Sequence, residues 1–100
     1  MGVQKYLDAS TGHITYEDNH KLFAQHQSFP TRVVSHQHGW WINVPEKKLW
    51  EDELIASQIQ AQGYSKDFLA LLLFAVKHGC WWVNLDCDGS YIEGLNSFDW

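Results

Sequence analysis

Basic side chains are scarce in this chain. Its 100 residues include seven Lys and Arg against twelve Asp and Glu, which gives a formal net charge of −5. Because phosphate contacts are made mainly by Lys and Arg, this balance argues against direct binding of nucleic acid. It permits an acidic surface that competes with nucleic acid for a basic groove on another protein, with an ordinary solvated surface as the alternative. The acidic side chains that we expect on that surface are Glu51, Asp52, Glu53, Asp86 and Asp88.

The chain also lacks a long apolar run. The longest one, residues 68–76, has nine residues, whereas a membrane-spanning helix needs about 20. The first ten residues contain one Lys and no apolar stretch of the kind that a secretory signal requires. We therefore expect a cytoplasmic protein that does not enter a membrane.

Only two cysteines are present, Cys80 and Cys87. The stretch that contains them is predicted to be a strand, which would separate them by about 23 Å at about 3.3 Å per residue. A disulfide needs Cα atoms within about 7 Å of each other. We therefore expect two free thiols, as is usual in a reducing cytoplasm.

Catalytic signatures are missing as well. The sequence contains no G-x-S-x-G nucleophile motif, no cysteine-nucleophile signature and no glycine-rich phosphate-binding loop. The prediction is a protein that is not an enzyme and that carries no cofactor.

Apolar residues, by contrast, are abundant. Hydrophobic residues make up 45% of the chain and aromatic residues 15%, enough for a dense core in a single domain over residues 1–100. Helices are predicted at 16–27, 50–60 and 66–77, the first beginning with a capping box of Thr15 and Asp18 and the last with Ser65 as N-cap. Strands are predicted at 12–15, 31–37, 40–44 and 80–86, with an extended piece through Tyr91 and Ile92. These elements indicate an α+β fold, a two-layer sandwich with a three- to four-stranded sheet containing a central hairpin and two or three helices packed mainly on one face.

The hairpin determines which side chains share a face. We expect a two-residue turn at His38 and Gly39, so that Gln37 faces Trp40 and His36 faces Trp41. The sequence Trp-Trp-aliphatic-Asn-aliphatic occurs at 40–44 and again at 81–85. Alternation along each strand then gives one wholly apolar face and one that mixes indole with amide groups.

The mixed face is the first candidate site, because rigid aromatics beside amides and one Arg are typical of protein interfaces. The alternative is that the helix at 50–60 or the C-terminal residues cover this face, which would make its tryptophans part of the core. The residues predicted to bind a protein partner are Arg32, His36, Trp41, Asn43, Trp82 and Asn84.

Metal ligands offer a second interpretation, a zinc-binding or small-ligand protein that uses His36, His38, His78 and Cys80. These are zinc-compatible groups, but structural zinc sites usually pair ligands two to four residues apart, whereas here one residue separates each pair. Residues 84–89 also match the start of a calcium-binding loop, but Leu95 occupies the position where that loop needs a bidentate Glu. We therefore predict no bound metal.

Several segments, in order, carry a resemblance. They are residues 10–18, which begin Ser-Thr-Gly-His-Ile-Thr, residues 39–45 and 79–88, and the closing Phe98-Asp99-Trp100. Together they are similar to a domain of unknown function in small uncharacterised bacterial proteins carried on plasmids, integrative elements and prophages. The pattern includes no catalytic residues, and the pair His36 and His38 is not part of it.

The resemblance implies a context, since small acidic proteins of mobile elements are often inhibitors of host defence, such as anti-CRISPR or anti-restriction proteins. The hypothesis is therefore a non-enzymatic protein-binding module. Its narrower form is a phage or plasmid inhibitor that occupies a basic or nucleic-acid-binding surface. Its partner would be a protein of a nucleic-acid-handling host complex. A homodimer formed through the tryptophan face is a further possibility.

Overall fold

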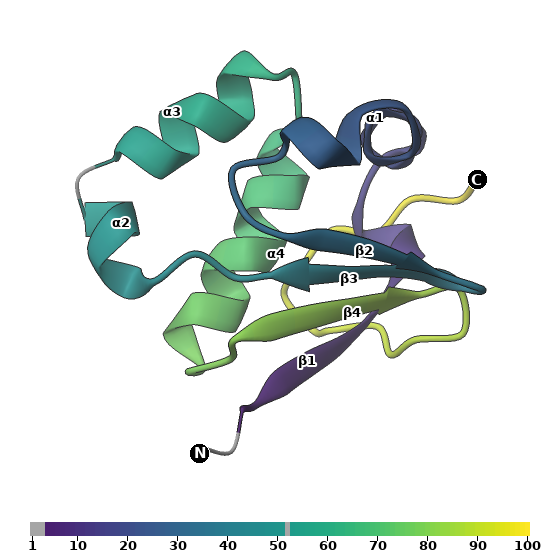
Figure 1. The fold of residues 1–100 in the computed structure, drawn as a ribbon. Coiled ribbons are helices and arrows are strands. Elements are labelled where there is room, and N and C mark those ends of the chain that lie inside the picture. Colours follow the sequence, from purple (N-terminus) through teal and green to yellow (C-terminus); the bar gives the residue numbers. More distant parts are fainter. Residues whose placement is uncertain (1–3, 52) are drawn as a thin grey trace.

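The computed structural model describes residues 4–51 and 53–100. It is a mixed α+β fold with a single four-stranded sheet, in the spatial order β1-β4-β3-β2 (Figure 1). β1 runs parallel to β4, whereas β2, β3 and β4 are antiparallel neighbours. The elements, including two short 3₁₀ turns labelled η, are β1 (Tyr6–Ser10), η1 (Thr11–His13), α1 (Tyr16–Gln25), η2 (His26–Ser28), β2 (Val33–His36), β3 (Gly39–Asn43), α2 (Lys47–Glu51), α3 (Leu54–Ala61), α4 (Lys66–Lys77) and β4 (Trp82–Asp86).

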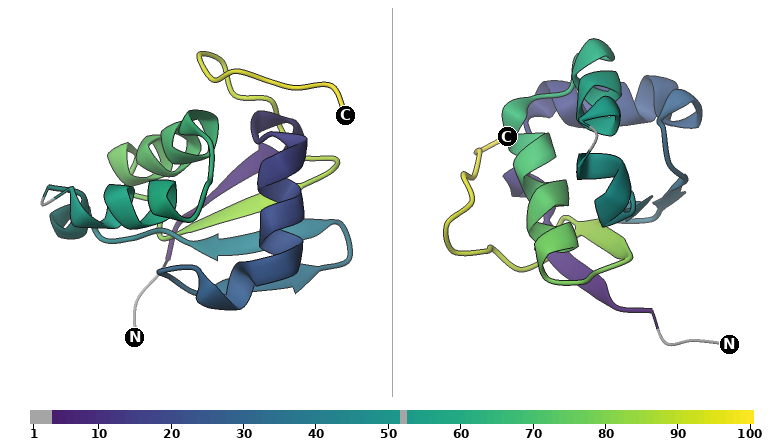
Figure 2. Two further views of the ribbon diagram at one scale, coloured as in Figure 1. Left: turned by 90° about the horizontal axis from the view of Figure 1, so that it is seen from above. Right: turned by 90° about the vertical axis from the view of Figure 1, so that its left-hand side faces the viewer.

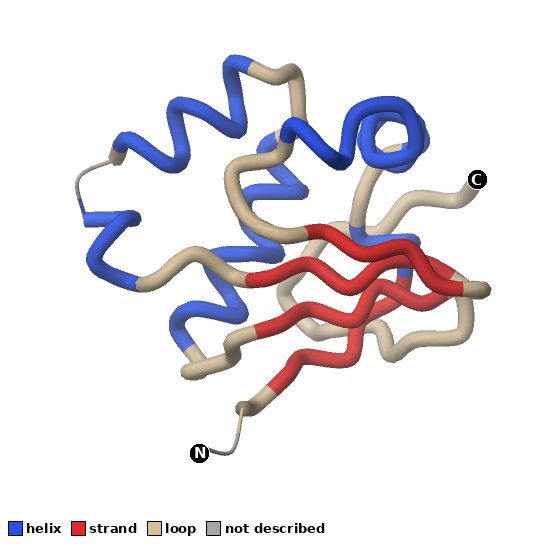
Figure 3. The backbone as a smooth tube through the Cα atoms, viewed as in Figure 1, coloured by secondary structure: helices blue, strands red, loops and turns tan. Residues whose placement is uncertain are grey.

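The helices lie on one side of the sheet, which makes the fold a two-layer sandwich, as predicted (Figures 1 and 2). Between the layers, α4 supplies Phe68, Leu71 and Leu72, and the sheet supplies Ile42, Val83 and Leu85, all fully buried. The tube representation shows the other face of the sheet without a helix packed on it (Figure 3). None of the helices in the described residues is long and apolar enough to span a bilayer.

Asp18 joins the starts of two helices in the helical layer. The predicted capping box is present, because Thr15 Oγ1 accepts from the Asp18 amide at 3.0 Å and Asp18 Oδ2 accepts from the Thr15 amide at 3.1 Å. Asp18 also accepts hydrogen bonds from the amide and the hydroxyl of Ser65, the predicted N-cap of α4. The predicted helix 66–77 is confirmed, and one buried carboxylate holds its start against α1.

The N-terminal part of the chain differs from the prediction of an edge strand at 12–15. Residues 11–13 form η1, whose N-cap Ser10 accepts a hydrogen bond from the Gly12 amide. The edge strand is β1, which ends at Ser10, directly before η1. β1 places Leu7 and Ala9 opposite Val83 and Leu85. The strand forms because Leu7 and Ala9 pack into the core when β1 pairs in parallel with β4 at the edge of the sheet.

The predicted hairpin is present, but its register was wrong by two residues. Val34 pairs with Trp41 and His36 with Gly39, so the turn is at Gln37 and His38. A two-residue slip keeps every side chain on its predicted face, whereas a one-residue slip would have exchanged the faces. Gly39 is the first residue of β3, and the position requires glycine because a Cβ there would overlap the carbonyl oxygen of Leu85 on β4.

The predicted helix at 50–60 was also partly wrong. The segment forms two helices, α2 and α3, with Glu53 between them at φ 57°, a left-handed conformation that is uncommon for a residue other than glycine. β4 begins at Trp82, two residues later than predicted.

The C-terminal residues form no strand; they are held instead by hydrogen bonds to η1 and its neighbours. The buried His13 ring accepts from the Ile92 amide through Nε2 at 2.7 Å and donates from Nδ1 to the Asn96 carbonyl at 2.7 Å. The Phe98 amide donates to the Gly12 carbonyl, and Trp100 Nε1 donates to the Ile14 carbonyl. Because Ile92 and Leu95 pack against the core, this segment belongs to the helical side of the sheet.

Candidate protein-interaction face

The candidate site is the face of the sheet that points away from the helices, here called the open face. Alternation along the strands assigns side chains to it, and the strand pairings place them side by side. No helix or strand of the described residues covers it (Figures 1 and 2). Its side chains are Tyr6, Asp8, Arg32, Val34, His36, Trp41, Asn43, Trp82, Asn84 and Asp86.

Three aromatic rings from three strands form the aromatic cluster of this face. Tyr6 and Trp41 meet edge to face with ring centroids 5.2 Å apart, and Trp41 and Trp82 meet in the same way at 6.5 Å. Edge-to-face contacts at these distances are favourable. Trp41 and Trp82 are half-buried, and Tyr6 is 54% exposed. The rings therefore shield one another while they keep apolar surface in contact with water.

The polar side chains of the open face bind one another and the backbone. His36 Nε2 donates to Asn84 Oδ1 at 2.9 Å, while His36 Nδ1 accepts from the His38 amide at 3.2 Å. Asn43 Nδ2 donates to the Trp81 carbonyl at 3.1 Å. In this arrangement the His36 ring is neutral, with its proton on Nε2, and the three predicted polar residues help to hold the strand geometry.

A shallow hollow of about 460 Å³ lies on this face, lined by Gln4, Tyr6, Arg32, Val34, Trp41 and Trp82. Trp82 Nε1 donates to Gln4 Oε1 at 2.9 Å, so the indole edge is already satisfied. The hollow offers aromatic and aliphatic surface with one cation, the exposed Arg32. It contains three of the six predicted partner-binding residues. Val34 was predicted on this face but not as a partner-binding residue, and Tyr6 and Gln4 were missed.

The acidic residues do not form one surface. Glu51 and Glu53 flank the junction of α2 and α3, whereas Asp86 and Asp88 lie at the far end of β4, on the other side of the molecule (Figure 1). The fifth predicted acidic residue, Asp52, lies outside the described residues. The four described acidic residues therefore lie in two separate places and do not form a single patch.

The predicted metal ligands are also divided between two places. His36 and His38 flank the hairpin turn, beside the end of β4, because Gly39 pairs with Asp86. His78 and Cys80 precede Trp82 at the start of β4. The structure thus separates the two pairs by the length of a strand and does not bring the four groups to one tetrahedral site.

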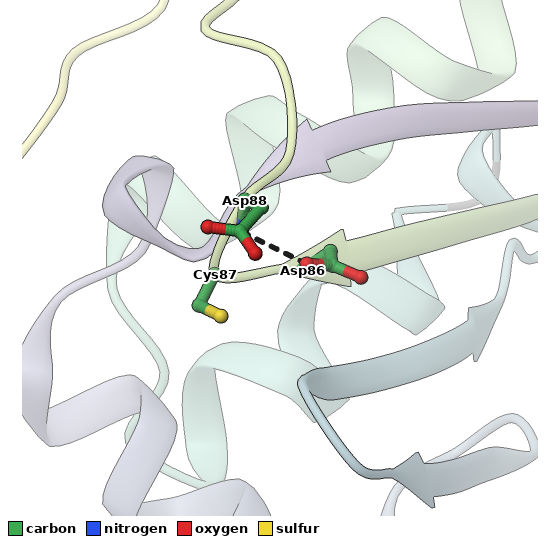
Figure 4. Close-up of side chains that lie close together, drawn as sticks. All are labelled: Asp86, Cys87 and Asp88. Atoms are coloured by element: carbon green, nitrogen blue, oxygen red, sulfur yellow. Dashed lines mark hydrogen bonds between the residues drawn. The ribbon is translucent and has the colours of Figure 1, made fainter.

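Another group, Asp86, Cys87 and Asp88, has ligand atoms that lie within 4.8 Å of one another (Figure 4). These are consecutive residues of a turn, in which the Asp88 amide donates to Asp86 Oδ1 at 2.8 Å. Cys87 and Asp88 are exposed. The hydrogen bond gives the Asp86 carboxylate a structural role in the turn.

Neither cysteine forms a disulfide, as predicted: Cys80 is buried and Cys87 is exposed. Cys80 belongs to the core cluster and acts there as a small apolar side chain.

Comparisons with known proteins give one match. A family model described as the C-terminal domain of a family of unknown function, DUF5983, matches residues 6–100. No curated protein and no solved structure matches the chain.

Proposed function

The chain belongs to this family of unknown function, and we propose from its geometry that it is a non-enzymatic protein-binding module that uses the open face as its contact surface. One observation supports this proposal above the others. The aromatic cluster of Tyr6, Trp41 and Trp82 lies on the face of the sheet that no described helix covers.

Chemical composition favours a protein as the partner. Trp, Tyr and Arg are the residues most enriched among those that dominate binding energy at interfaces, and the hollow combines all three types. The edge-to-face contacts hold the rings of Trp41 and Trp82 before any partner arrives. Ordering a flexible side chain at an interface costs about 0.5–1.5 kcal/mol. Binding avoids most of this cost at Trp41 and Trp82, because their rings are already held in place.

A narrower form of the proposal is an inhibitor of a host defence system, of the anti-CRISPR or anti-restriction kind, carried by a mobile element and active in the cytoplasm. In this form the open face would cover a basic or nucleic-acid-binding surface of a nucleic-acid-handling complex. The net charge of −5 would attract a basic partner over a distance and raise the association rate, because steering depends on overall charge. The aromatic cluster would supply the close contact.

The test compares two tryptophan sites that differ in position. The double variant Trp41→Ala/Trp82→Ala removes the aromatic cluster, and Trp81→Ala serves as the matched control, because Trp81 is 50% exposed but precedes β4 outside the open face. Each tagged protein is used to capture partners from a bacterial host lysate, with quantification by mass spectrometry. We expect the wild-type chain and Trp81→Ala to enrich the same protein and the double variant to lose it while its circular dichroism stays native.

Equal capture by the double variant would remove the open face from consideration. For the narrower proposal, the captured complex is assayed for nuclease activity with added wild-type chain. Inhibition that disappears with the double variant supports an inhibitor, and unchanged nuclease activity argues against it.

A further inference from the structure

The side chains of the open face form a regular array. The strand pairings align three rows across the sheet, and the amide of Asn43 donates to the carbonyl of Arg32 at 2.8 Å, which extends the β2–β3 register by one residue. In the strand order β1-β4-β3-β2, the first row is Tyr6, Trp82, Asn43 and Arg32, and the second is Asp8, Asn84, Trp41 and Val34. The third row is Ser10, Asp86, Gly39 and His36, of which only Asp86 and His36 present side chains on the open face, because Ser10 is buried and Gly39 has none.

The charges in this array lie on opposite sides of the aromatic cluster. Arg32 is at one corner, where the first row meets β2. Asp86 is in the third row on β4, and Asp8 is in the second row on β1. The line from Tyr6 to Trp41 runs diagonally between the Arg32 corner and the two carboxylates. The open face is therefore divided into a cationic and an anionic half, with aromatic rings along the boundary.

The side-chain amides of Asn43 and Asn84 are divided between the same two halves of the face. The hydrogen bond to the Trp81 carbonyl engages Asn43 through its nitrogen, and the hydrogen bond from His36 engages Asn84 through its oxygen. The described residues give no hydrogen-bond partner to Asn43 Oδ1, an acceptor, or to Asn84 Nδ2, a donor. Asn43 lies in the same half as Arg32, and Asn84 lies in the same half as Asp86.

These observations point to one occupant. Strands are about 4.8 Å apart and residues about 3.3 Å apart along a strand. With these spacings, we consider a two-fold axis that lies in the plane of the face along the line from Tyr6 to Trp41. Rotation about this axis places Arg32 of one copy opposite Asp86 of the other and Asn43 of one copy close to Asn84 of the other. We infer that the open face binds a second copy of this chain, face to face about that axis. Arg32 of each copy then pairs with Asp86 of the other, and the aromatic clusters stack at the centre.

This inference rests on the proposed function, since it names the protein that the open face binds. A two-fold interface must be self-complementary, because one patch meets itself, and the division into halves satisfies that requirement. The face is only about 19 Å wide, four strands at about 4.8 Å each. Strands of five residues make it about 17 Å long. Its projected area of about 320 Å² is therefore below the roughly 800 Å² per partner of a standard complex, and we expect a dimer that dissociates on dilution.

Charge reversal tests the inference. Arg32→Asp places two acidic groups in each contact, and Asp86→Arg places two basic groups there. We expect each variant alone to dimerise at least about tenfold more weakly than the wild type, because like charges face each other. An equimolar mixture of the two variants should recover association, since both contacts of the mixed dimer again pair opposite charges. The measurement is sedimentation velocity over a concentration series at low ionic strength, and Asp99→Arg is the control for a charge reversal outside the face.

The outcomes separate this inference from the proposed function. Dimerisation that is lost in each variant and regained in the mixture supports the two-fold contact, because recovery requires both variants to be folded. Absence of recovery between variants whose circular dichroism is native overturns it. A wild-type chain that stays monomeric up to its solubility limit overturns the second copy as partner, whereas loss of a captured protein in Trp41→Ala/Trp82→Ala would still support the proposed function. A dimer that tolerates both charge reversals and the double tryptophan variant forms elsewhere and overturns this inference, whereas the proposed function is overturned by equal capture of a host protein by the double tryptophan variant.

Discussion

The two faces of the sheet are built from the same strands and have different surroundings. On the helical side, Trp40 is 5% exposed, donates from Nε1 to Asn19 Oδ1 at 3.0 Å and has its ring centroid 5.5 Å from that of His26. Its neighbour in the sequence, Trp41, points to the open face and lies beside the rings of Tyr6, His36 and Trp82, which are themselves partly or largely accessible. Aromatic content therefore does not distinguish a core face from a binding face. The difference is whether the same chain supplies a layer to cover it.

The largest expected effect compares these two adjacent tryptophans. Trp40→Ala leaves a cavity beneath α1 and should lower the free energy of unfolding by about 3–5 kcal/mol. Trp41→Ala removes a side chain that already contacts water, and the expected loss is about 1 kcal/mol. Urea denaturation followed by circular dichroism measures both values. Equal losses would contradict the distinction between the two faces.

The next effect concerns the attachment of the helical layer. Asp18 is 1% exposed and accepts hydrogen bonds from Thr15 and Ser65. Asp18→Ala leaves these donors without their acceptor, and we expect a loss of about 3 kcal/mol in the free energy of unfolding, because bonds to a charged group contribute about 1.5–3 kcal/mol each. Glu17→Ala, an exposed neighbour on the same helix, should change it by less than about 0.5 kcal/mol. Comparable losses for the two variants would show that Asp18 does not join α1 to α4.

The smallest effect is at Tyr64, a core residue on the helical side. Its hydroxyl is buried without a hydrogen-bond partner in the described residues. Burial, and secondarily the negative charge of Asp18, raise the pKa of this hydroxyl from 10.0 to about 12. Tyr64→Phe should therefore leave stability at neutral pH within about 1 kcal/mol of the wild type.

The raised pKa also sets the sign of a pH dependence. The folded chain holds the Tyr64 proton more tightly than the unfolded chain, so the associated stability is present below pH 10 and is lost as pH rises towards 12. The wild type should therefore lose more stability over this range than Tyr64→Phe, measured by urea denaturation at each pH. Parallel pH profiles for the two proteins would contradict the raised pKa.

The sequence predicted the fold well where the pattern of apolar residues was strong. The helix 66–77 was predicted to the residue, because Ser65 is a good N-cap and an apolar run follows it. The hairpin faces were also right despite the wrong register, since a slip of two preserves the alternation of side chains. Faces depend on parity alone, whereas register depends on the turn, and the close approach of Gly39 to Leu85 has no local signal in the sequence.

The other errors arose where tertiary contacts decide the local structure. β1 was missed because Leu7 and Ala9 are only two apolar positions around Asp8, a weak pattern that becomes a strand when β4 lies beside it. The left-handed residue Glu53, which divides α2 from α3, carries none of the glycine or asparagine signal that usually marks this conformation. The open face was predicted as a set of residues. That no helix or strand of the described residues covers it, and that Tyr6 joins it, followed only from the strand order.

The pairing of β1 with β4 has a consequence for how the chain folds. Tyr6 lies opposite Trp82, so the first strand must wait for the last one before it can enter the sheet. A contact between residues so far apart in sequence must close a long loop, and the entropic cost of closing it is met before the contact is formed. Proteins rich in such contacts therefore fold slowly. On the ribosome, residues 6–10 would leave the exit tunnel long before their partner strand is synthesised. Completion of the sheet is therefore expected to wait for the synthesis of β4, with β1 as the last strand to join.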